Sequence, residues 1–390
     1  MKLAARMANL GTETAFEVLA RAKQLEAEGR DIVHLQIGEP DFDTPKNIVE
    51  AGVTALREGW THYGPASGLP ALREAIAEEV ASTRGVDVSP DQVVVVPGGK
   101  PIMFFLMMAV LEEGCEAVYP NPGFPIYESM INCLGCKAVP APLREANEFA
   151  LDVDELKTLL NDRTRLLILN SPSNPCGGVL DRDDIDGIAE ALRPYPNCWI
   201  MSDEIYSRIH YDGLKHDSLA RHADLRDRLV ILDGFSKTYA MTGWRLGYGV
   251  MSAELATRIT QLQVNATSCT ASFTQMAGVE ALRGPQDDVA AMIREFDARR
   301  HVIVDGLNAL PGVSCLMPKG AFYVFPNFEE HGKRSKELET LFLEKAGVAC
   351  LTGTSFGAHG EGYLRFSYAN SVPNIEKALS RIRELIQSGL

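Results

Sequence analysis

The sequence predicts an α/β fold, in which a large domain with a mostly parallel sheet covered by helices on both faces is joined to a smaller α+β domain. Two observations lead to this prediction. Over roughly the first two thirds of the 390 residues, short runs that are apolar throughout alternate with amphipathic helical segments, which is typical of a parallel sheet buried on both faces. After residue 275, long helical segments precede short strands, an order that indicates an α+β unit.

Five apolar runs are expected to form the sheet of the large domain, at residues 92–99, 115–120, 165–172, 198–204 and 229–235. Helical segments separate them, among them KPIMFFLMMAVL, DVDELKTLL and DRDDIDGIAEALR. Three short strands are then expected in GAFYVFP, VACLTG and GYLRFSYA, followed by a final amphipathic helix in NIEKALSRIRELIQ. We therefore expect an N-terminal arm and part of the small domain at 1–45, the large domain at 46–275 and the small domain at 276–390.

Composition excludes some classes of partner. The net charge of −14 and pI near 5.1 disfavour binding to nucleic acid or to an anionic membrane surface. The N-terminal stretch has no secretory-signal pattern, and the apolar segment 102–111 is too short to cross a bilayer, so we expect a cytoplasmic protein. Eight scattered cysteines are expected as free thiols. The pair Cys133 and Cys136 is better explained by packing than by a redox or zinc site, and no metal is expected.

Chemically distinctive residues follow the ends of the expected strands. Because the carboxyl ends of parallel strands meet at one edge of a sheet, where ligands bind, we expect these residues to converge. A glycine pair that opens a helix can bind a phosphate, and an arginine can close on it. A lysine with a lowered pKa forms Schiff bases, and an aspartate can face a pyridine nitrogen. One ligand, pyridoxal 5′-phosphate, satisfies all of them: Gly98, Gly99, Lys100, Asn174, Asp203, Tyr206, Lys237 and Arg245.

Each residue also has an ordinary explanation. Lys237 alone would more often be a surface lysine at a strand end, and Arg365 a surface ion-pair partner. Phe124 and Tyr63 would more often be packing aromatics, and Asp203 a helix cap. The functional interpretation is favoured because these residues occur together, in order, at successive strand ends.

The sequence resembles the fold-type-I, class I/II aminotransferases, close to the bacterial aspartate aminotransferase subgroup. The resemblance covers some 330 residues and is carried by the ordered motifs IGEPDFDTP, THYGPASGLPALREAIA, VVVPGGKP, NPGFPIY, NSPSNPCGG, SDEIY, FSKTYAMTGWRLGY, PKGAFYVFP and GYLRFSYA. It implies the pyridoxal-phosphate-dependent transferase fold and a homodimer whose active site is shared between subunits. It also implies transfer of an amino group from an L-amino acid to a 2-oxo acid by a ping-pong mechanism.

The resemblance assigns roles to the cofactor-binding residues. It implies that Lys237 is the Schiff-base lysine and the base that moves a proton, and that Asp203 faces the pyridine nitrogen. Tyr206 and Asn174 would contact the phenolic oxygen, and Phe124 would stack on the ring. Gly99, Lys100 and Arg245 match the phosphate region.

Further roles concern the substrate and the second subunit. Tyr63 would reach a phosphate in the partner subunit. Arg365 would pair with the substrate α-carboxylate, helped by Asn174 and the backbone of Gly38. Lys100 matches a lysine that can read a distal carboxylate in that subgroup, although a structural role or one at the phosphate edge fits it equally well.

Some positions depart from the family pattern and leave the substrate open. Gly234 replaces a serine that contacts phosphate, with Ser236 nearby, and Cys176 replaces a threonine. Ala15 stands where a threonine helps to bind acidic substrates, with Thr12 and Thr14 close by. The segment FFLMM, Tyr323 and Phe325 hint at an apolar pocket, although core packing explains them as well. A β-eliminating C–S lyase on the same fold is the alternative function, and a non-catalytic transcription regulator ranks last.

Overall fold

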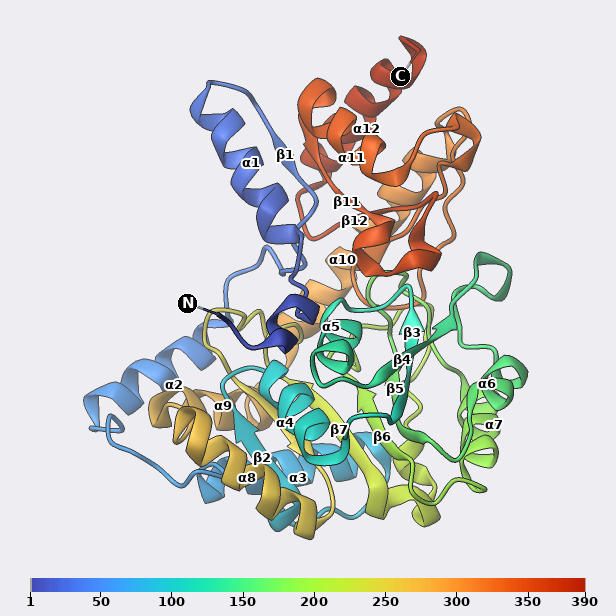
Figure 1. The fold of residues 1–390 in the computed structure, drawn as a ribbon. Coiled ribbons are helices and arrows are strands. Elements are labelled where there is room, and N and C mark those ends of the chain that lie inside the picture. Colours follow the sequence, from blue (N-terminus) through green and yellow to red (C-terminus); the bar gives the residue numbers. More distant parts are fainter. Residues whose placement is uncertain (1, 390) are drawn as a thin grey trace.

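The computed structural model describes residues 2–389 and is built around a seven-stranded sheet (Figure 1). Its strand order is β2-β8-β7-β6-β5-β3-β4, and every neighbouring pair is parallel except the two that involve β8. The predicted fold class is confirmed, and all five predicted runs form strands. The strands are β2 (Val93–Val96), β3 (Glu116–Asn121), β4 (Lys137–Pro142), β5 (Thr164–Asn170), β6 (Trp199–Asp203), β7 (Leu229–Gly234) and β8 (Gly247–Val250).

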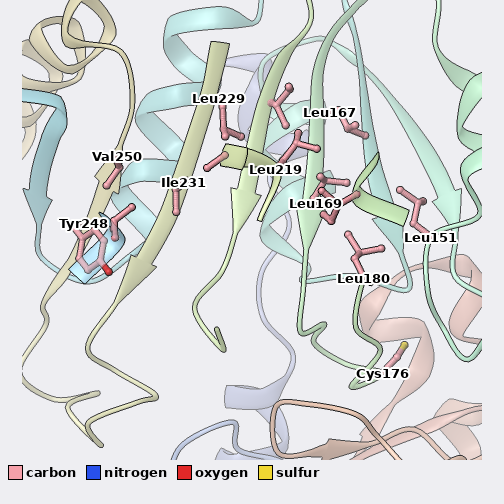
Figure 2. Packing of buried hydrophobic residues seen from close by; sticks show 14 of the residues in the cluster. Leu151, Leu167, Leu169, Cys176, Leu180, Leu219, Leu229, Ile231, Tyr248 and Val250 are labelled. Atoms are coloured by element: carbon pink, nitrogen blue, oxygen red, sulfur yellow. The ribbon is translucent and has the colours of Figure 1, made fainter. Parts of the chain in front are cut away.

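Helices cover both faces of this sheet. Successive residues of each strand point to opposite faces, and both sets are apolar, so each face packs in a core of its own. Leu167, Leu169 and Ile231 pack in one core, which Figure 2 shows at close range, whereas Leu166 and Ile168 pack in another. The first core contains residues of α3 (Pro70–Arg84), α6 (Val153–Leu159), α7 (Arg182–Leu192) and α9 (Ser272–Arg283), which packs on α2 (Lys46–Arg57). The second contains residues of α4 (Lys100–Val110), α5 (Ile126–Cys133) and α8 (Ala253–Thr267).

The C-terminal part forms a second layer of structure above one end of the large sheet (Figure 1). A three-stranded antiparallel sheet has the order β11-β12-β9 and packs in a core rich in phenylalanine. Its strands are β9 (Tyr323–Val324), β11 (Leu351–Thr352) and β12 (Leu364–Ser367). The helices of this part are α10 (Asp287–Asn308), α11 (Ser335–Leu341) and α12 (Val372–Gln387), which confirms the predicted final helix.

The N-terminal segment contacts both parts of the molecule, because its first helix packs on α5 and its strand pairs with the C-terminal part. It comprises a short 3-10 helix (Ala5–Asn9), α1 (Ala15–Ala27) and β1 (Val33–His34), and β1 pairs in parallel with β10 (Val348–Ala349). The domain boundaries near residues 45 and 275 stay a prediction. Across residues 2–389, none of the helices combines the length and the apolar character that a membrane span requires. The eight cysteines are free.

Candidate active site

A pocket of about 350 Å³ lies where the large sheet meets the C-terminal part. Its lining includes the last residue of β6, the first residue of α4, the turn after β7, and residues of β9 and β12. The end of β6 and the turn after β7 belong to the carboxyl edge of the parallel strands, where ligands bind in open α/β sheets. The structure brings together here nearly all the residues that the sequence singled out: Gly38, Gly99, Lys100, Phe124, Asn174, Asp203, Tyr206, Lys237, Arg245 and Arg365.

Asp203 is a buried carboxyl group at the end of β6, with 3% of its surface exposed. Its Oδ2 accepts a hydrogen bond of 2.5 Å from the Tyr127 hydroxyl, and its Oδ1 accepts one of 3.3 Å from the backbone N–H of Ile205. Burial raises the pKa of Asp203 to about 6, although the Tyr127 hydrogen bond favours the ionised form. No lysine or arginine of the described residues pairs with this carboxylate, so a cationic ligand group would be stabilised beside it.

Lys237 lies in the turn that follows β7, where buried Phe235 anchors the chain. Its Nζ donates a hydrogen bond to the carbonyl oxygen of Gly38. Burial lowers the pKa of Lys237 to about 8. The negative charge of Glu39 raises this pKa, and the positive charge of Arg365 lowers it further. More of this amine is therefore uncharged, and so nucleophilic, near neutral pH than is the case for an exposed lysine. A side chain at position 38 would displace Tyr323, since a Cβ there would lie 2.2 Å from the Tyr323 hydroxyl oxygen.

The turn between β2 and α4 has the features of a phosphate cradle. Gly98 has a φ of +83°, Gly99 is the N-cap of α4, and the helix N-terminus opens into the pocket. Arg245 also lines the pocket, and its guanidinium packs directly on Gly98, where a Cβ would lie 2.3 Å from Nη2. Unpaired N–H groups at a helix N-terminus and a guanidinium both favour an anion such as phosphate. Ser236 lines the same pocket, whereas Gly234 does not.

Arg365 comes from β12 and is only 4% exposed. Its Nη1 donates to Asn174 Oδ1 at 2.9 Å and its Nη2 to the carbonyl oxygen of Gln36 at 2.5 Å. Its guanidinium carbon lies 4.5 Å from the ring centroid of Tyr323, and its Nε has no hydrogen-bond partner. Burial lowers the pKa of Arg365. A buried arginine with an unused donor and without a carboxylate partner is suited to binding a carboxylate ligand.

Tyr206 and Phe124 complete the predicted set. The Tyr206 hydroxyl lies 2.8 Å from that of Tyr323, and both side chains are buried. Phe124 lines the pocket with its ring 5.8 Å from that of Tyr127. Tyr63 lies outside the pocket and is 90% exposed. Its predicted contact with a partner subunit stays a prediction.

Several pocket residues were not among the predicted site residues. Tyr127 ends the quoted motif NPGFPIY, so that the motif itself offered a signal for it. Tyr323 had been noted only as a candidate for an apolar pocket, and Phe325, noted with it, packs in the core instead. No residue of FFLMM lines the pocket; Met103, which directly precedes this segment, does so together with Lys100 of the same helix. Glu39 belongs to the quoted motif IGEPDFDTP, whereas Glu13 lies outside every quoted motif.

Residues 30–382 match the family described as Aminotransferase class I and II. The chain belongs to this family. The aspartate aminotransferase of Pyrococcus horikoshii is 40% identical over 95% of this chain and 94% of its own. The crystal structure of the aspartate aminotransferase from Rhizobium meliloti superposes with a TM-score of 0.95 at 34% identity, covering 99% of both chains. That of an aromatic aminotransferase from Pyrococcus horikoshii gives a TM-score of 0.89 at 38% identity, covering 94% of this chain and 99% of the other.

Membership of the aminotransferase class I and II family confirms the predicted resemblance and identifies the chain as a transaminase. The large sheet with helices on both faces is the fold of these relatives. Their names do not favour the β-eliminating lyase, which had been the alternative.

Proposed function

We propose that this transaminase uses pyridoxal 5′-phosphate to move the amino group of an L-amino acid to a 2-oxo acid. One observation carries the proposal. The same pocket holds a buried carboxyl without a cationic partner, a lysine whose pKa is about 8, and a glycine turn packed on an arginine. These groups match the ring nitrogen, the aldehyde and the phosphate of a single ligand.

The residues fit the cofactor in charge as well as in type. Burial disfavours the ionised form of Asp203, and a protonated ring nitrogen beside it would stabilise that form. The phosphate would lie at the N-terminus of α4 beside Arg245, where the absence of a Cβ on Gly98 leaves room for the guanidinium. Tyr206 and Asn174 line the pocket and are the proposed contacts of the phenolic oxygen, and Phe124 is proposed to stack on the ring.

When bound, the cofactor supplies an electron sink for cleavage of a bond at the substrate Cα. Arg365 orients the substrate by binding its α-carboxylate, which takes the unused donor of the guanidinium. Lys237, whose pKa is lowered by burial, would act as the base that removes the proton from the substrate Cα and holds it for the return transfer. The second half-reaction runs these steps backward with a 2-oxo acid.

We also propose a homodimer in which Tyr63 reaches the other subunit's site. Tyr63 is 90% exposed in the single chain, and large apolar side chains are exposed on the neighbouring helices α4 and α8, namely Phe104, Met108 and Val264. Such clustered exposure marks a surface that another protein covers. Light scattering of the purified protein would test this, and a monomer at all concentrations would refute it.

The function is tested by locating the bond to the cofactor and by following one half-reaction. The protein is mixed with pyridoxal phosphate, reduced with borohydride and digested, and the tagged lysine is expected at 237. A single amino donor without an acceptor should then convert the bound cofactor to its amine form and release one equivalent of 2-oxo acid. A tag on another lysine, or continuous release of keto acid and ammonia without an acceptor, would contradict the proposal. Lys100→Ala is a matched control that should retain the tag at 237.

A further inference from the structure

We propose that Glu13 is a displaceable counter-ion of Lys100 that adapts the site to two kinds of substrate side chain. The Glu13 carboxylate stays on Lys100 when the donor has an apolar side chain, and it gives way to the distal carboxylate when the donor is acidic. The inference rests on the proposed function, because it concerns substrate selection in the same pocket.

The pairing itself is the first observation. The Glu13 carboxylate forms an ion pair with the Nζ of Lys100, and both residues line the pocket. The ammonium of Lys100 lies 5.5 Å from the ring centroid of Phe124. The side chain of Glu13 is 18% exposed and that of Lys100 is 48% exposed. The carboxylate of a substrate bound beside Phe124 would therefore compete with Glu13 for the same ammonium.

Lys100 is the basic residue of the lining that remains available to the side chain of a substrate. Four basic residues of the described chain line the pocket, and the proposed function uses Lys237, Arg245 and Arg365 for the amine, the phosphate and the α-carboxylate. Lys100 remains, and Glu13 already balances its charge. The other carboxylate without an assigned role, that of Glu39, accepts a hydrogen bond from the hydroxyl of Thr242 instead.

The apolar part of the lining suits an amino donor with an apolar side chain, which leaves the ion pair of Glu13 and Lys100 intact. Phe16, Met103, Leu351 and Phe356 line the pocket together with Glu13. Because Glu13 neutralises Lys100, an apolar substrate side chain meets no unpaired charge there. Its binding therefore removes no unpaired charge from water. The pocket therefore accepts such a donor without a change in the ion pair.

The backbone around Glu13 is held from both sides, so only the side chain needs to move. The N–H of Gly11 donates to Ser129 Oγ at 2.8 Å in α5, and the hydroxyl of Thr14 donates to Ser355 Oγ at 2.6 Å in the C-terminal part. An ion pair with a half-exposed ammonium is worth little in free energy. An acidic substrate replaces one carboxylate by another, which keeps the charge of Lys100 compensated while Glu13 rotates into solvent.

The test compares Glu13→Gln with Glu17→Gln, since Glu17 is exposed on α1 and lies outside the pocket. Both variants remove one negative charge from the same segment. The kcat/KM of the half-reaction is measured with aspartate and with phenylalanine, and the Kd of the holoenzyme is measured for succinate and for 3-phenylpropanoate. Glu13→Gln is expected to raise the aspartate-to-phenylalanine ratio about fivefold and to tighten succinate binding similarly, whereas Glu17→Gln changes neither.

A second background shows whether the effect passes through Lys100. In Lys100→Met, the additional change Glu13→Gln is expected to leave the ratio unaltered. An equal shift in Glu17→Gln, no shift in Glu13→Gln, or a shift that persists without Lys100 would each overturn the inference. If no donor reacts with the unaltered enzyme, the proposed function fails, and the two binding constants still decide the role of Glu13.

Discussion

The contact between Gly98 and Arg245 yields a prediction whose size follows from the structure. In Gly98→Ala two effects are combined. The residue has a φ of +83°, and an alanine in this region costs about 1–2 kcal/mol. The new Cβ would also lie 2.3 Å from Nη2 and 2.9 Å from Cζ of Arg245, so that the guanidinium must move away. The loss of one charge-assisted hydrogen bond to phosphate costs about 1.5–3 kcal/mol, which is about 10- to 150-fold in affinity.

A matched variant separates the two effects. Gly213 has a φ of +72°, and nothing lies within 4 Å of a Cβ built on it. Gly213→Ala is therefore expected to lower the free energy of unfolding by about 1–2 kcal/mol as well. Its affinity for pyridoxal phosphate should stay unchanged. Urea unfolding measures the first quantity, and an absorbance titration of the cofactor-free protein measures the second. If Gly98→Ala binds the cofactor as tightly as Gly213→Ala does, Arg245 does not hold the phosphate.

Three further outcomes are expected. The uncharged amine of Lys237 is the nucleophile, so the rate of its reaction with pyridoxal phosphate should rise through a pKa of about 8 in stopped-flow absorbance; a rise centred above pH 10 would contradict the effect of burial. Arg365→Lys replaces a two-pronged donor by a point charge, so the KM for the amino acid should rise at least about tenfold; an unchanged KM would remove its assigned role. Arg84 donates at 2.9 Å to Glu204 and at 2.5 Å to Asp233, all buried. Arg84→Met should therefore cost about 3–5 kcal/mol in urea unfolding, and a loss below 1 kcal/mol would show that those carboxylates are compensated elsewhere.

The strands that the sequence failed to predict have weak patterns for physical reasons. The strand β4 contains Pro140 and Pro142, which normally argue against a strand. It lies at the edge of the sheet, where a missing backbone donor is tolerated. The strand β8 has only four residues, two of them glycines. A Cβ on Gly247 would lie 2.6 Å from the backbone nitrogen of Gly99, so the close approach of two backbones replaces the apolar pattern.

Some residues of the candidate site could be predicted from local sequence patterns, and others could not. Asp203 and Lys237 were predicted because each follows an apolar strand, and the ends of parallel strands converge. The contact between Glu13 and Lys100 joins residues 87 positions apart, and no spacing or periodicity reports such a pair. The hydroxyl of Tyr323 meets that of Tyr206 from 117 positions away. Local pattern therefore located the groups on the large sheet, whereas the contributions of the other segments depend on how the chain folds back.

The pairing of β1 with β10 has a consequence for biosynthesis. Val33 aligns with Val348 and His34 with Ala349, so a strand made early has to wait for a partner made late. Until then its N–H and C=O groups form an open edge that another polypeptide can join. A chain that ends before residue 348 would contain every strand of the large sheet but would lack the partner of β1.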